Sequence, residues 1–291
     1  MKKIGVAVTD PGDWTGISLC NSIEYYGMTP VKFSFNEATS DISSGKIYSG
    51  NIDLTALEAV IVRDLGPATH NDVSFRFDIL CQLKELGIAV INSPDSIAKA
   101  ANKYVSSFLF QKNGIPTPKT IVTNKLDEAA AALSSFGRAV VKPVFGYKGI
   151  GVECVRDSKN GVEKLKKLFK EKRLIYIQEF IPNPGRDIRV FVVNGKVAGS
   201  IYRVAPEGGW INNLSQGGSA KPCVLTGEQE RLALKAAAVI GTVYAGVDII
   251  EGDYVIEING TPSGKGIFEA SGVDVTRMIA EYLEGLILPK N

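Results

Sequence analysis

The chain has 291 residues and a mass of 31.2 kDa, enough for one large domain or for two to three small ones. Its 45% hydrophobic and 22% charged residues are ordinary for a soluble globular protein. A net charge of +2, with no basic block that carries aromatic residues, argues against a nucleic-acid binder. Four scattered cysteines, no signal peptide and no apolar run long enough to span a bilayer predict a cytoplasmic protein with reduced thiols.

The first part of the chain alternates strand and helix patterns. Strands are expected at 2–9, 29–35, 58–66 and 88–94, and helices that end at glycines at 17–27 and 75–87. Near-continuous apolar strands that alternate with helices are typical of a parallel sheet covered by helices. We therefore expect residues 1–96 to form one α/β domain.

The remainder is expected to form two further units. In the middle block, residues 97–181, one helix is predicted over 96–114, followed by strands and helices in an α+β arrangement. In the last block, residues 182–291, the segment 186–205 reads as a hairpin through Asn194-Gly195. Helices are expected there at 228–241 and 273–287.

A second hairpin, residues 247–260, carries polar side chains within apolar strands. With Gly252-Asp253 as a two-residue loop, Asp248 lies directly opposite Glu257, and strand alternation puts Asn259 on the same face. Opposed like charges are destabilising unless a cation lies between them, and Mg²⁺ prefers oxygen ligands. The alternative is two exposed acids on a solvated face, separated by a slipped register. The core face would hold Val247, Ile249, Tyr254, Ile256 and Ile258.

A lysine and a glycine-rich loop follow each other in the middle block. Lys142 closes the strand 138–144, directly before the loop FGYKGIG at 145–151, which includes Gly146, Lys148 and Gly149. Glycines let backbone N–H groups approach phosphate oxygens, and the lysine adds a point charge. The spacing matches neither the P-loop nor the Rossmann motif, and a plain hairpin loop is the alternative.

Other polar residues interrupt the strands that come next. The end of the strand 174–181 could pair with an adenine edge through the backbone of Gln178, Glu179, Phe180 and Ile181, or could be an ordinary edge strand. Further on, arginines in strands indicate an anion or a carboxylate partner, so an Asp187–Arg189 ion pair competes with ligand binding. The polar residues of this part are Asp187, Arg189, Arg203, Asn212 and Asn213.

The order of these features resembles the ATP-grasp superfamily, and within it the RimK-like carboxylate–amine ligases that add glutamate to an acceptor. The likeness covers nearly the whole chain and is clearest in VIVRDLG, VVKPVFGYKGIGV, QEFI…DIRVFVV and GVDII…EINGTPSGKG. It implies an ATP-grasp fold preceded by a Rossmann-like parallel-sheet domain at 1–96. Residues 97–181 would be the lid subdomain, and 182–291 the C-terminal subdomain with the metal site.

The resemblance also implies roles for residues of this sequence. Lys103 and Lys142 would bind nucleotide phosphates under the glycine lid, the segment 178–181 would hold adenine, and Asp187 would lie near the ribose. Arg189 would reach the transferred phosphoryl group. Asp248, Glu257 and Asn259 would bind two Mg²⁺ or Mn²⁺ ions.

The implied reaction is ATP-dependent addition of L-glutamate to an acceptor carboxylate through an acyl phosphate. The likeness is greatest to archaeal enzymes that glutamylate coenzymes, which implies a tetrahydromethanopterin acceptor and a homodimer or larger assembly. A deazaflavin coenzyme, a protein C-terminus or a small-molecule kinase are alternatives, as is a nucleotide-binding regulatory module. Phe145 and Tyr147 in the lid, and Ile211-Asn212, depart from the family pattern and leave the acceptor open.

Two further residues have alternative interpretations. Arg63 ends a predicted parallel strand, where open α/β sheets bind ligands, so it is a candidate acceptor contact. Its alternative is a surface arginine paired with Asp64. His70 is the only histidine, so a multi-histidine metal site is excluded and a Ser-His-Asp triad is disfavoured. His70 itself is expected in a surface loop.

Overall fold

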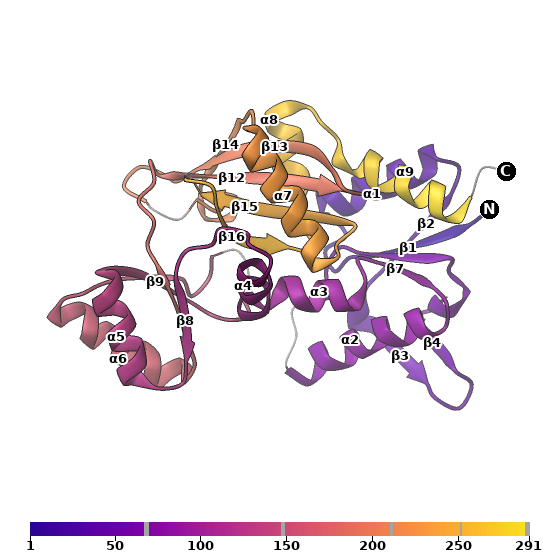
Figure 1. The fold of residues 1–291 in the computed structure, drawn as a ribbon. Coiled ribbons are helices and arrows are strands. Elements are labelled where there is room, and N and C mark those ends of the chain that lie inside the picture. Colours follow the sequence, from indigo (N-terminus) through magenta and orange to yellow (C-terminus); the bar gives the residue numbers. More distant parts are fainter. Residues whose placement is uncertain (67–69, 147–148, 210–211, 251, 289–291) are drawn as a thin grey trace.

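The N-terminal part is built on a parallel four-stranded sheet. The computed structural model describes residues 1–66, 70–146, 149–209, 212–250 and 252–288, and Figure 1 shows its ribbon. The sheet has the strand order β2-β1-β6-β7, with parallel pairing throughout. Its elements are β1 (Lys3–Ala7), α1 (Trp14–Tyr25), β2 (Thr29–Phe33), β6 (Ala59–Val62), α2 (His70–Glu85) and β7 (Ala89–Ile91). The predicted parallel sheet is confirmed, whereas His70 begins α2 and does not lie in a loop.

The chain segment between β2 and β6 forms a small antiparallel sheet that was not predicted from the sequence. Its strands are β3 (Ala38–Asp41), β4 (Lys46–Ser49) and β5 (Ile52–Asp53), flanked by the 3₁₀ helices η1 (Phe35–Glu37) and η2 (Leu54–Ala56). These strands are short and largely polar, so they lack the apolar alternation that indicates a strand.

The helix expected over 96–114 is wrong as one element, because two helices occupy this range. They are α3 (Pro94–Ala101) and α4 (Lys103–Lys112), separated at Asn102. The backbone of Asn102 is extended, and its side chain accepts from the N–H groups of Tyr104 and Val105, at 3.1 and 3.2 Å. Asn102 also bridges to Phe145 in the glycine loop, so this break brings the start of α4 beside the loop.

The middle part carries an antiparallel sheet with the strand order β10-β9-β11-β8, which we call the lid sheet. Two helices pack against it, and their apolar side chains form a separate core with the strands. The elements are β8 (Thr120–Thr123), α5 (Leu126–Phe136), β9 (Arg138–Lys142), β10 (Glu153–Arg156), α6 (Lys159–Lys172) and β11 (Ile175–Glu179). In Figure 1 this part projects to the left of the molecule.

The C-terminal part is built on an antiparallel sheet with the order β14-β13-β12-β15-β16, and α7 covers one of its faces. The predicted hairpin through Asn194-Gly195 is present as β12 and β13. The elements are β12 (Arg186–Val193), β13 (Lys196–Val204), η3 (Leu214–Gln216), β14 (Ser219–Pro222), α7 (Gly227–Ile240), β15 (Tyr244–Ile250), β16 (Tyr254–Asn259), α8 (Lys265–Ser271) and α9 (Val275–Ile287). Helices α3 and α4 also pack against this part, on β16 and α7.

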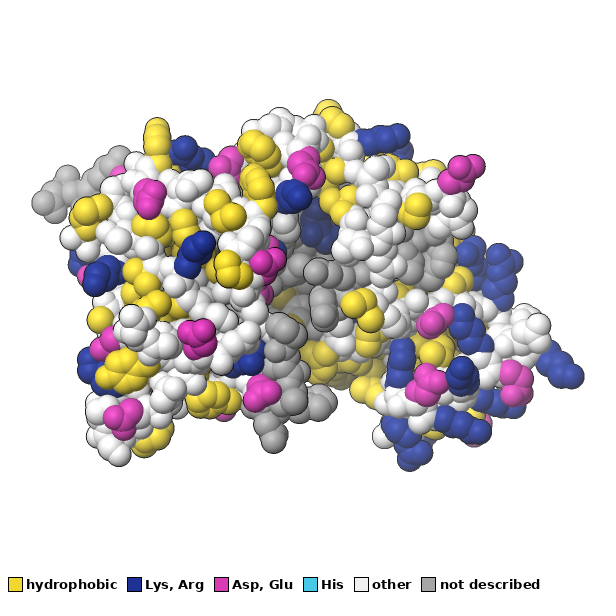
Figure 2. Space-filling view, turned by 180° about the vertical axis from the view of Figure 1, so that it is seen from behind, with side chains coloured by type: hydrophobic (Ala, Val, Ile, Leu, Met, Phe, Trp, Pro, Cys, Tyr) yellow, Lys and Arg dark blue, Asp and Glu magenta, His cyan; other side chains and the backbone are white. Residues whose placement is uncertain are grey.

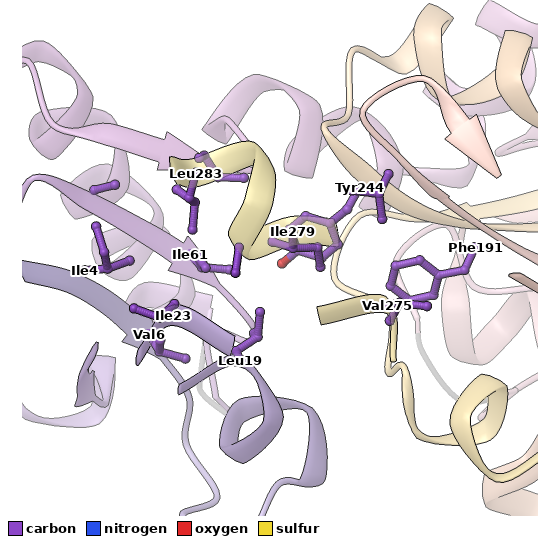
Figure 3. Packing of buried hydrophobic residues seen from close by; sticks show 14 of the residues in the cluster. Ile4, Val6, Leu19, Ile23, Ile61, Phe191, Tyr244, Val275, Ile279 and Leu283 are labelled. Carbon is purple, nitrogen blue, oxygen red and sulfur yellow. The ribbon is translucent and has the colours of Figure 1, made fainter. Parts of the chain in front are cut away.

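The last helix, α9, joins the N-terminal and C-terminal parts in one core. Ile279 and Leu283 of α9 are fully buried, and they share a cluster with Ile4 of β1, Ile61 of β6 and Phe191 of β12. Figure 3 shows these side chains converging between the parallel sheet and the C-terminal sheet. Because burying each such side chain contributes about 1.5–3 kcal/mol, this shared core fixes the two parts against each other.

Candidate active site

A pocket lies between the lid sheet and the C-terminal sheet. Figure 2 shows the molecule hollowed between the part that carries the lid sheet and the rest. The predicted residues that line the pocket are Lys103, Lys142, Gly146, Gly149, Gln178, Glu179, Phe180, Ile181, Asp187, Arg203, Asn212, Asn213, Asp248 and Glu257.

The hairpin of β15 and β16 places its acids as expected but through a different register. Asp248 pairs with Glu257, as predicted, whereas Ile250 pairs with Tyr254 and Ile249 with Val255. The register therefore shifts by one residue after Asp248, which is a β-bulge. Asp248 is only 3% exposed, so the alternative of two acids on a solvated face is wrong.

The bulge corrects the core face that the sequence predicted. Val255 is fully buried in the core under α7, whereas Ile256 lines the pocket and Tyr254 is only half-buried. Shifting a strand by one residue exchanges the faces of its side chains, so Tyr254 and Ile256 were assigned to the wrong face. Ile258, beyond the bulge, does lie in the core.

A row of charged side chains crosses the polar face of the C-terminal sheet. Arg189 of β12 pairs in register with Asp248 of β15, which pairs with Glu257 of β16. The Arg189 guanidinium donates to both Asp248 oxygens, with 3.0 Å from the second terminal nitrogen to Oδ2. Gly246 makes room for this arginine, because a Cβ there would lie 3.1 Å from the Arg189 side chain.

The alternative of an Asp187–Arg189 ion pair is wrong, since each residue pairs across strands. Asp187 accepts from Arg203 on β13, at 2.8 and 2.6 Å, and Arg203 also donates to Asp248 at 2.8 Å. Directly opposed side chains on neighbouring strands have Cβ atoms about 5 Å apart, closer than residues two apart along one strand. Burial opposes ionisation of Asp248, but Arg189 and Arg203 outweigh it and hold its pKa below the ordinary value.

The start of α4 reaches the same row from the other side. Lys103 is 7% exposed, and its Nζ lies 2.9 Å from Glu257 Oε1 and 3.1 Å from the carbonyl oxygen of Gly146. Its backbone N–H donates to the carbonyl of Val144 at 3.0 Å. Lys103 therefore links the acidic hairpin to the glycine loop.

Lys142 differs from the other cations of the pocket because its described hydrogen bond is to a neutral amide. Its Nζ donates to Gln178 Oε1 at 2.7 Å, and Gln178 in turn donates to Thr120 and Tyr176. Burial lowers the pKa of Lys142 to about 8; Glu257 opposes this shift and Lys103 adds to it. A buried ammonium without a bonded carboxylate is suited to an anionic ligand.

The end of β11 forms another wall, as predicted, but part of its backbone is already paired. The N–H of Glu179 donates to Lys119 and that of Phe180 to Arg138, at 2.8 and 3.0 Å. An adenine edge at this segment therefore cannot use those two N–H groups. The Arg138 guanidinium also lies over the Phe180 ring, 3.5 Å from its centroid.

The asparagines of the loop before β14 lie at the pocket as expected. Asn212 is 8% exposed. In the amide orientation that satisfies its neighbours, its nitrogen donates to the carbonyl of Gly185 at 3.2 Å and its oxygen accepts from the N–H of Asp187 at 3.3 Å. It thus orders the start of β12. Lys148 lies outside the described residues, as do Tyr147 and Ile211.

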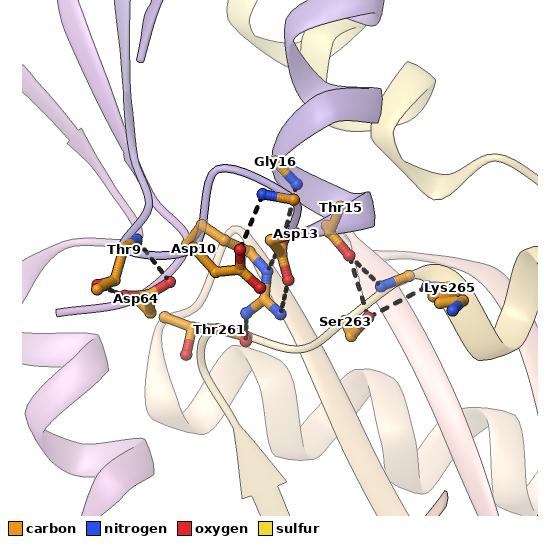
Figure 4. Close-up of polar contacts among 12 residues, drawn as sticks. Thr9, Asp10, Asp13, Thr15, Gly16, Asp64, Thr261, Ser263 and Lys265 are labelled. Carbon is orange, nitrogen blue, oxygen red and sulfur yellow. Dashed lines mark hydrogen bonds and ion pairs between the residues drawn. The ribbon is translucent and has the colours of Figure 1, made fainter. Parts of the chain in front are cut away.

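Asn259, Arg63 and Arg189 do not belong to the residues that line the pocket. The Asn259 side-chain oxygen accepts from the N–H of Thr261 at 2.8 Å. Arg63 pairs with Asp13, at 2.9 and 3.0 Å, and not with Asp64 as the alternative had it. Asp64 instead accepts from Thr9, and Figure 4 shows both sets of contacts.

The donor set fits a hard divalent cation. Among the described residues no group of three histidine, cysteine, aspartate or glutamate side chains converges. The candidate metal ligands are two carboxylates, Asp248 and Glu257, and the amide oxygen of Asn259, which lie on one face of the sheet. Mg²⁺ commonly takes one or two carboxylates, with waters and substrate phosphates completing its shell. Within the protein, the negative charges of Asp248 and Glu257 are compensated by Arg189, Arg203 and Lys103.

Apolar residues of the pocket were missed by the sequence analysis. They lie on both sheets and in the segment between β9 and β10: Val140, Ile150, Val152, Ile250 and, because of the bulge, Ile256. They look like ordinary core residues in the sequence, and only the pairing of the two sheets brings them together.

Comparison with known proteins identifies the family. Residues 100–283 match the model of the RimK-like ATP-grasp domain, and the chain belongs to this family. It is 45% identical to the tetrahydromethanopterin:alpha-L-glutamate ligase of Methanosarcina acetivorans, over 99% of this chain and 100% of the relative. It is 43% identical to the ligase of the same name in Methanocaldococcus jannaschii, over 82% of each chain.

Solved structures share the fold at lower identity. The ATP-grasp ligase PsnB in complex with a minimal precursor, Mg and ADP has a TM-score of 0.74 at 20% identity, over 98% of each chain. D-cycloserine synthetase DcsG has a TM-score of 0.76 at 17% identity, over 98% of this chain and 99% of that one. The predicted ATP-grasp fold with its N-terminal parallel sheet is thereby confirmed.

Proposed function

We propose that this protein is an ATP-dependent ligase that joins L-glutamate to an acceptor carboxylate, with tetrahydromethanopterin as the acceptor. Binding of ATP is supported above all by one observation: one pocket is lined by Lys103, Lys142, Asp248 and Glu257. The acceptor and the amino acid rest on the 45% identity with a ligase of that name, matched over essentially the full length of both chains.

ATP is proposed to enter the pocket with its base against the β11 end and its phosphates toward the two lysines. Phe180, Ile250 and Ile256 supply apolar surface for the base, and Lys142 supplies a cation bonded only to a neutral amide among its described contacts. Lys103 lies where it can exchange Glu257 for a phosphate oxygen. Gly146 and Gly149 of the glycine loop line the pocket, and the loop is proposed to exclude water.

Asp248, Glu257 and Asn259 are the residues proposed to hold Mg²⁺ or Mn²⁺, with two ions as the family likeness implies. A bound divalent ion would neutralise charge on the transferred phosphoryl group. The side chains of this protein would then redistribute, because Lys103 and Arg189 are now occupied by the acids that the cation would neutralise.

The proposed reaction has two steps. An acceptor carboxylate oxygen attacks the γ-phosphorus of ATP, and the bond to ADP breaks, which gives an acyl phosphate. The amine nitrogen of glutamate then attacks the acyl carbon, the carbon–oxygen bond to phosphate breaks, and a proton leaves the nitrogen as the amide forms. Arg189 is proposed to steady the phosphoryl oxygens from the C-terminal sheet. No protein nucleophile is required.

The test incubates the protein with ATP, Mg²⁺, labelled glutamate and either a tetrahydromethanopterin or a deazaflavin acceptor, and identifies the product by mass. We expect acceptor-dependent release of ADP and phosphate together with a glutamylated pterin. A phosphorylated product without dependence on glutamate would instead indicate a kinase, and no ATP turnover would indicate a regulatory module.

The matched variants are Glu257→Gln and Glu153→Gln. Glu257→Gln is expected to lower metal-dependent ADP release by about a hundredfold, because one charge of the metal site is lost. Glu153 pairs with Lys164 of α6, and both side chains are partly exposed, so Glu153→Gln should retain activity. Activity of Glu257→Gln within a few-fold of normal would overturn the metal assignment. The homodimer or larger assembly stays a prediction, which light scattering tests.

A further inference from the structure

The segment that follows β16, from Asn259 to Thr261, is held by the N-terminal domain. Asn92, directly after β7, is fully buried, and its amide nitrogen donates to the carbonyl oxygen of Gly260 at 2.6 Å. Arg63, directly after β6, donates to the carbonyl oxygen of Thr261 at 2.8 Å. Two neighbouring strands of the parallel sheet thus contact two successive carbonyls beside the candidate metal ligand Asn259.

Asn92 uses every hydrogen-bonding position of its side chain. Besides Gly260, its amide nitrogen donates to the carbonyl of Tyr244 at 2.7 Å, and its oxygen accepts from the N–H groups of Val243 and Tyr244, at 2.6 and 3.1 Å. The Tyr244 hydroxyl donates back to the carbonyl of Val62 at 2.6 Å. The open end of the β15–β16 hairpin is therefore pinned on both strands.

Arg63 is equally constrained. Its side chain is 15% exposed, Nε and one terminal nitrogen bind both oxygens of Asp13, and the other terminal nitrogen is aimed at Thr261. Asp13 is itself fixed, because it caps α1 by accepting from the N–H of Gly16 at 2.8 Å. Figure 4 shows Asp13 at the start of α1 and Thr261 close to each other, the two residues that Arg63 contacts.

Thr261, which Arg63 holds, also orients the Asn259 side chain, but through a different peptide group: its carbonyl belongs to the Thr261–Pro262 peptide and its N–H to the Gly260–Thr261 peptide. Thr261 accepts from Arg63 through its carbonyl and donates from its N–H to the Asn259 side-chain oxygen at 2.8 Å. An amide oxygen has two lone pairs, so one remains for another partner, and its direction depends on where Thr261 lies. Gly260 lies close to α3, since a Cβ there would meet Ala100 at 3.2 Å.

We propose that Arg63 is a positioning residue that acts through Thr261 to orient the Asn259 oxygen toward a divalent cation. The inference rests on the proposed function, because it presupposes a metal at Asn259. It changes the role of Arg63 from acceptor contact to support of the metal site, with Asn92 holding the carbonyl of the Gly260–Thr261 peptide, whose N–H donates to Asn259. Residues that orient a metal ligand typically contribute about 10–100-fold to metal affinity.

A structural contact elsewhere between the same two parts provides the comparison. Ser22 of α1 contacts Thr276 of α9 at 2.8 Å, and Ser18 contacts Thr276 and Asp274. These contacts hold the N-terminal sheet to the C-terminal part without touching the Asn259 segment. If Arg63→Met weakened metal binding only by loosening the contact between the two parts, Ser22→Ala should weaken it too. If Arg63 positions Asn259, Ser22→Ala should leave metal binding unchanged.

The experiment measures Mn²⁺ binding to the full chain by electron paramagnetic resonance, with a non-hydrolysable ATP analogue and without acceptor or glutamate. Arg63→Met is expected to weaken Mn²⁺ binding by about tenfold. Asp13→Asn, which keeps a capping side chain but removes the charge that orients Arg63, should weaken it to a smaller degree. Ser22→Ala should match the wild type.

A double-mutant cycle tests whether Arg63 acts through Asn259. In an Asn259→Ala background, adding Arg63→Met should change Mn²⁺ affinity by less than twofold, because the ligand to be oriented is gone. Normal affinity in both Arg63→Met and Asp13→Asn, or additive losses in the double variant, would overturn the proposal. Failure of the wild type to bind Mn²⁺ would instead overturn the proposed metal site.

Discussion

Lys103 and Glu257 form an ion pair of 2.9 Å that connects the first residue of α4 with the acidic strand β16. The same pattern recurs at Asp248, whose two oxygens are shared by Arg189 and Arg203. Both acids of the hairpin are thus compensated within the protein. Binding of a nucleotide and a cation would exchange these internal partners for ligand groups, which makes the contribution of each charge measurable.

Replacing Lys103 with glutamine is expected to weaken binding of a non-hydrolysable ATP analogue by about 10–100-fold. The reason is the loss of one charge-assisted hydrogen bond to a phosphate, which contributes about 1.5–3 kcal/mol. Isothermal titration calorimetry in the presence of Mg²⁺ measures it. Lys99→Gln is the control, because Lys99 on α3 pairs only with the exposed Asp95 in its described contacts. Equal affinities for the two variants would contradict the role of Lys103.

The affinity for ATP should fall as the pH rises through about 8. Lys142 has a pKa of about 8 in the free protein, and a bound phosphate favours its charged form, so binding above this pH must take up a proton. Below pH 8 the lysine is already charged and the affinity should be flat. ATP itself contributes little there, since phosphate groups titrate near pH 6. Calorimetry between pH 6.5 and 9.5 follows the effect.

The control for this pH dependence is Lys142→Arg. An arginine stays charged over the whole range, so the decline above pH 8 should disappear even if the absolute affinity changes. The same decline in both proteins would assign it to another group.

Replacing Arg203 with methionine is expected to destabilise the fold by about 3–5 kcal/mol, because Asp187 and Asp248 would lose a buried partner. Urea denaturation measures the free energy of unfolding. Arg231→Met removes an exposed pair with Glu228 on α7 and should leave stability unchanged. If Arg203→Met is as stable as Arg231→Met, the buried network does not stabilise the sheet.

The bulge in β16 makes a prediction about two neighbouring residues. Val255→Ala should lower the free energy of unfolding by about 1–3 kcal/mol, because Val255 is fully buried under α7. Ile256→Ala should cost less stability but weaken binding of the ATP analogue, since Ile256 lines the pocket. The opposite result, with Ile256 critical for the core, would restore the regular hairpin that the sequence suggests.

The sequence was sufficient for features that depend on local periodicity and residue order. The parallel sheet followed from apolar strands alternating with helices, and Asp248 opposite Glu257 followed from counting back from a two-residue loop, although the register nearer the turn is different. The break at Asn102 was missed, because the residues on both sides favour a helix. The break accompanies a bridge to Phe145, a long-range contact that no local pattern indicates.

Long-range pairing explains the other differences. Sequence spacing suggested that Asp187 would pair with Arg189, but the partner of each lies on another strand, Arg203 and Asp248. The contact of Arg63 with Thr261 joins residues far apart in the chain, so no local pattern could indicate it. Such contacts depend on how the N-terminal sheet docks on the C-terminal one.

The position of α9 has a consequence for the order of assembly during synthesis. Ile279 and Leu283 complete the core around Ile4 and Ile61, although they are made long after β1 and β6. At translation rates of about 5–20 residues per second, the parallel sheet therefore waits many seconds with an apolar face uncovered. A nascent chain stopped before α9 should be a preferred chaperone client and protease target, whatever the state of its lid.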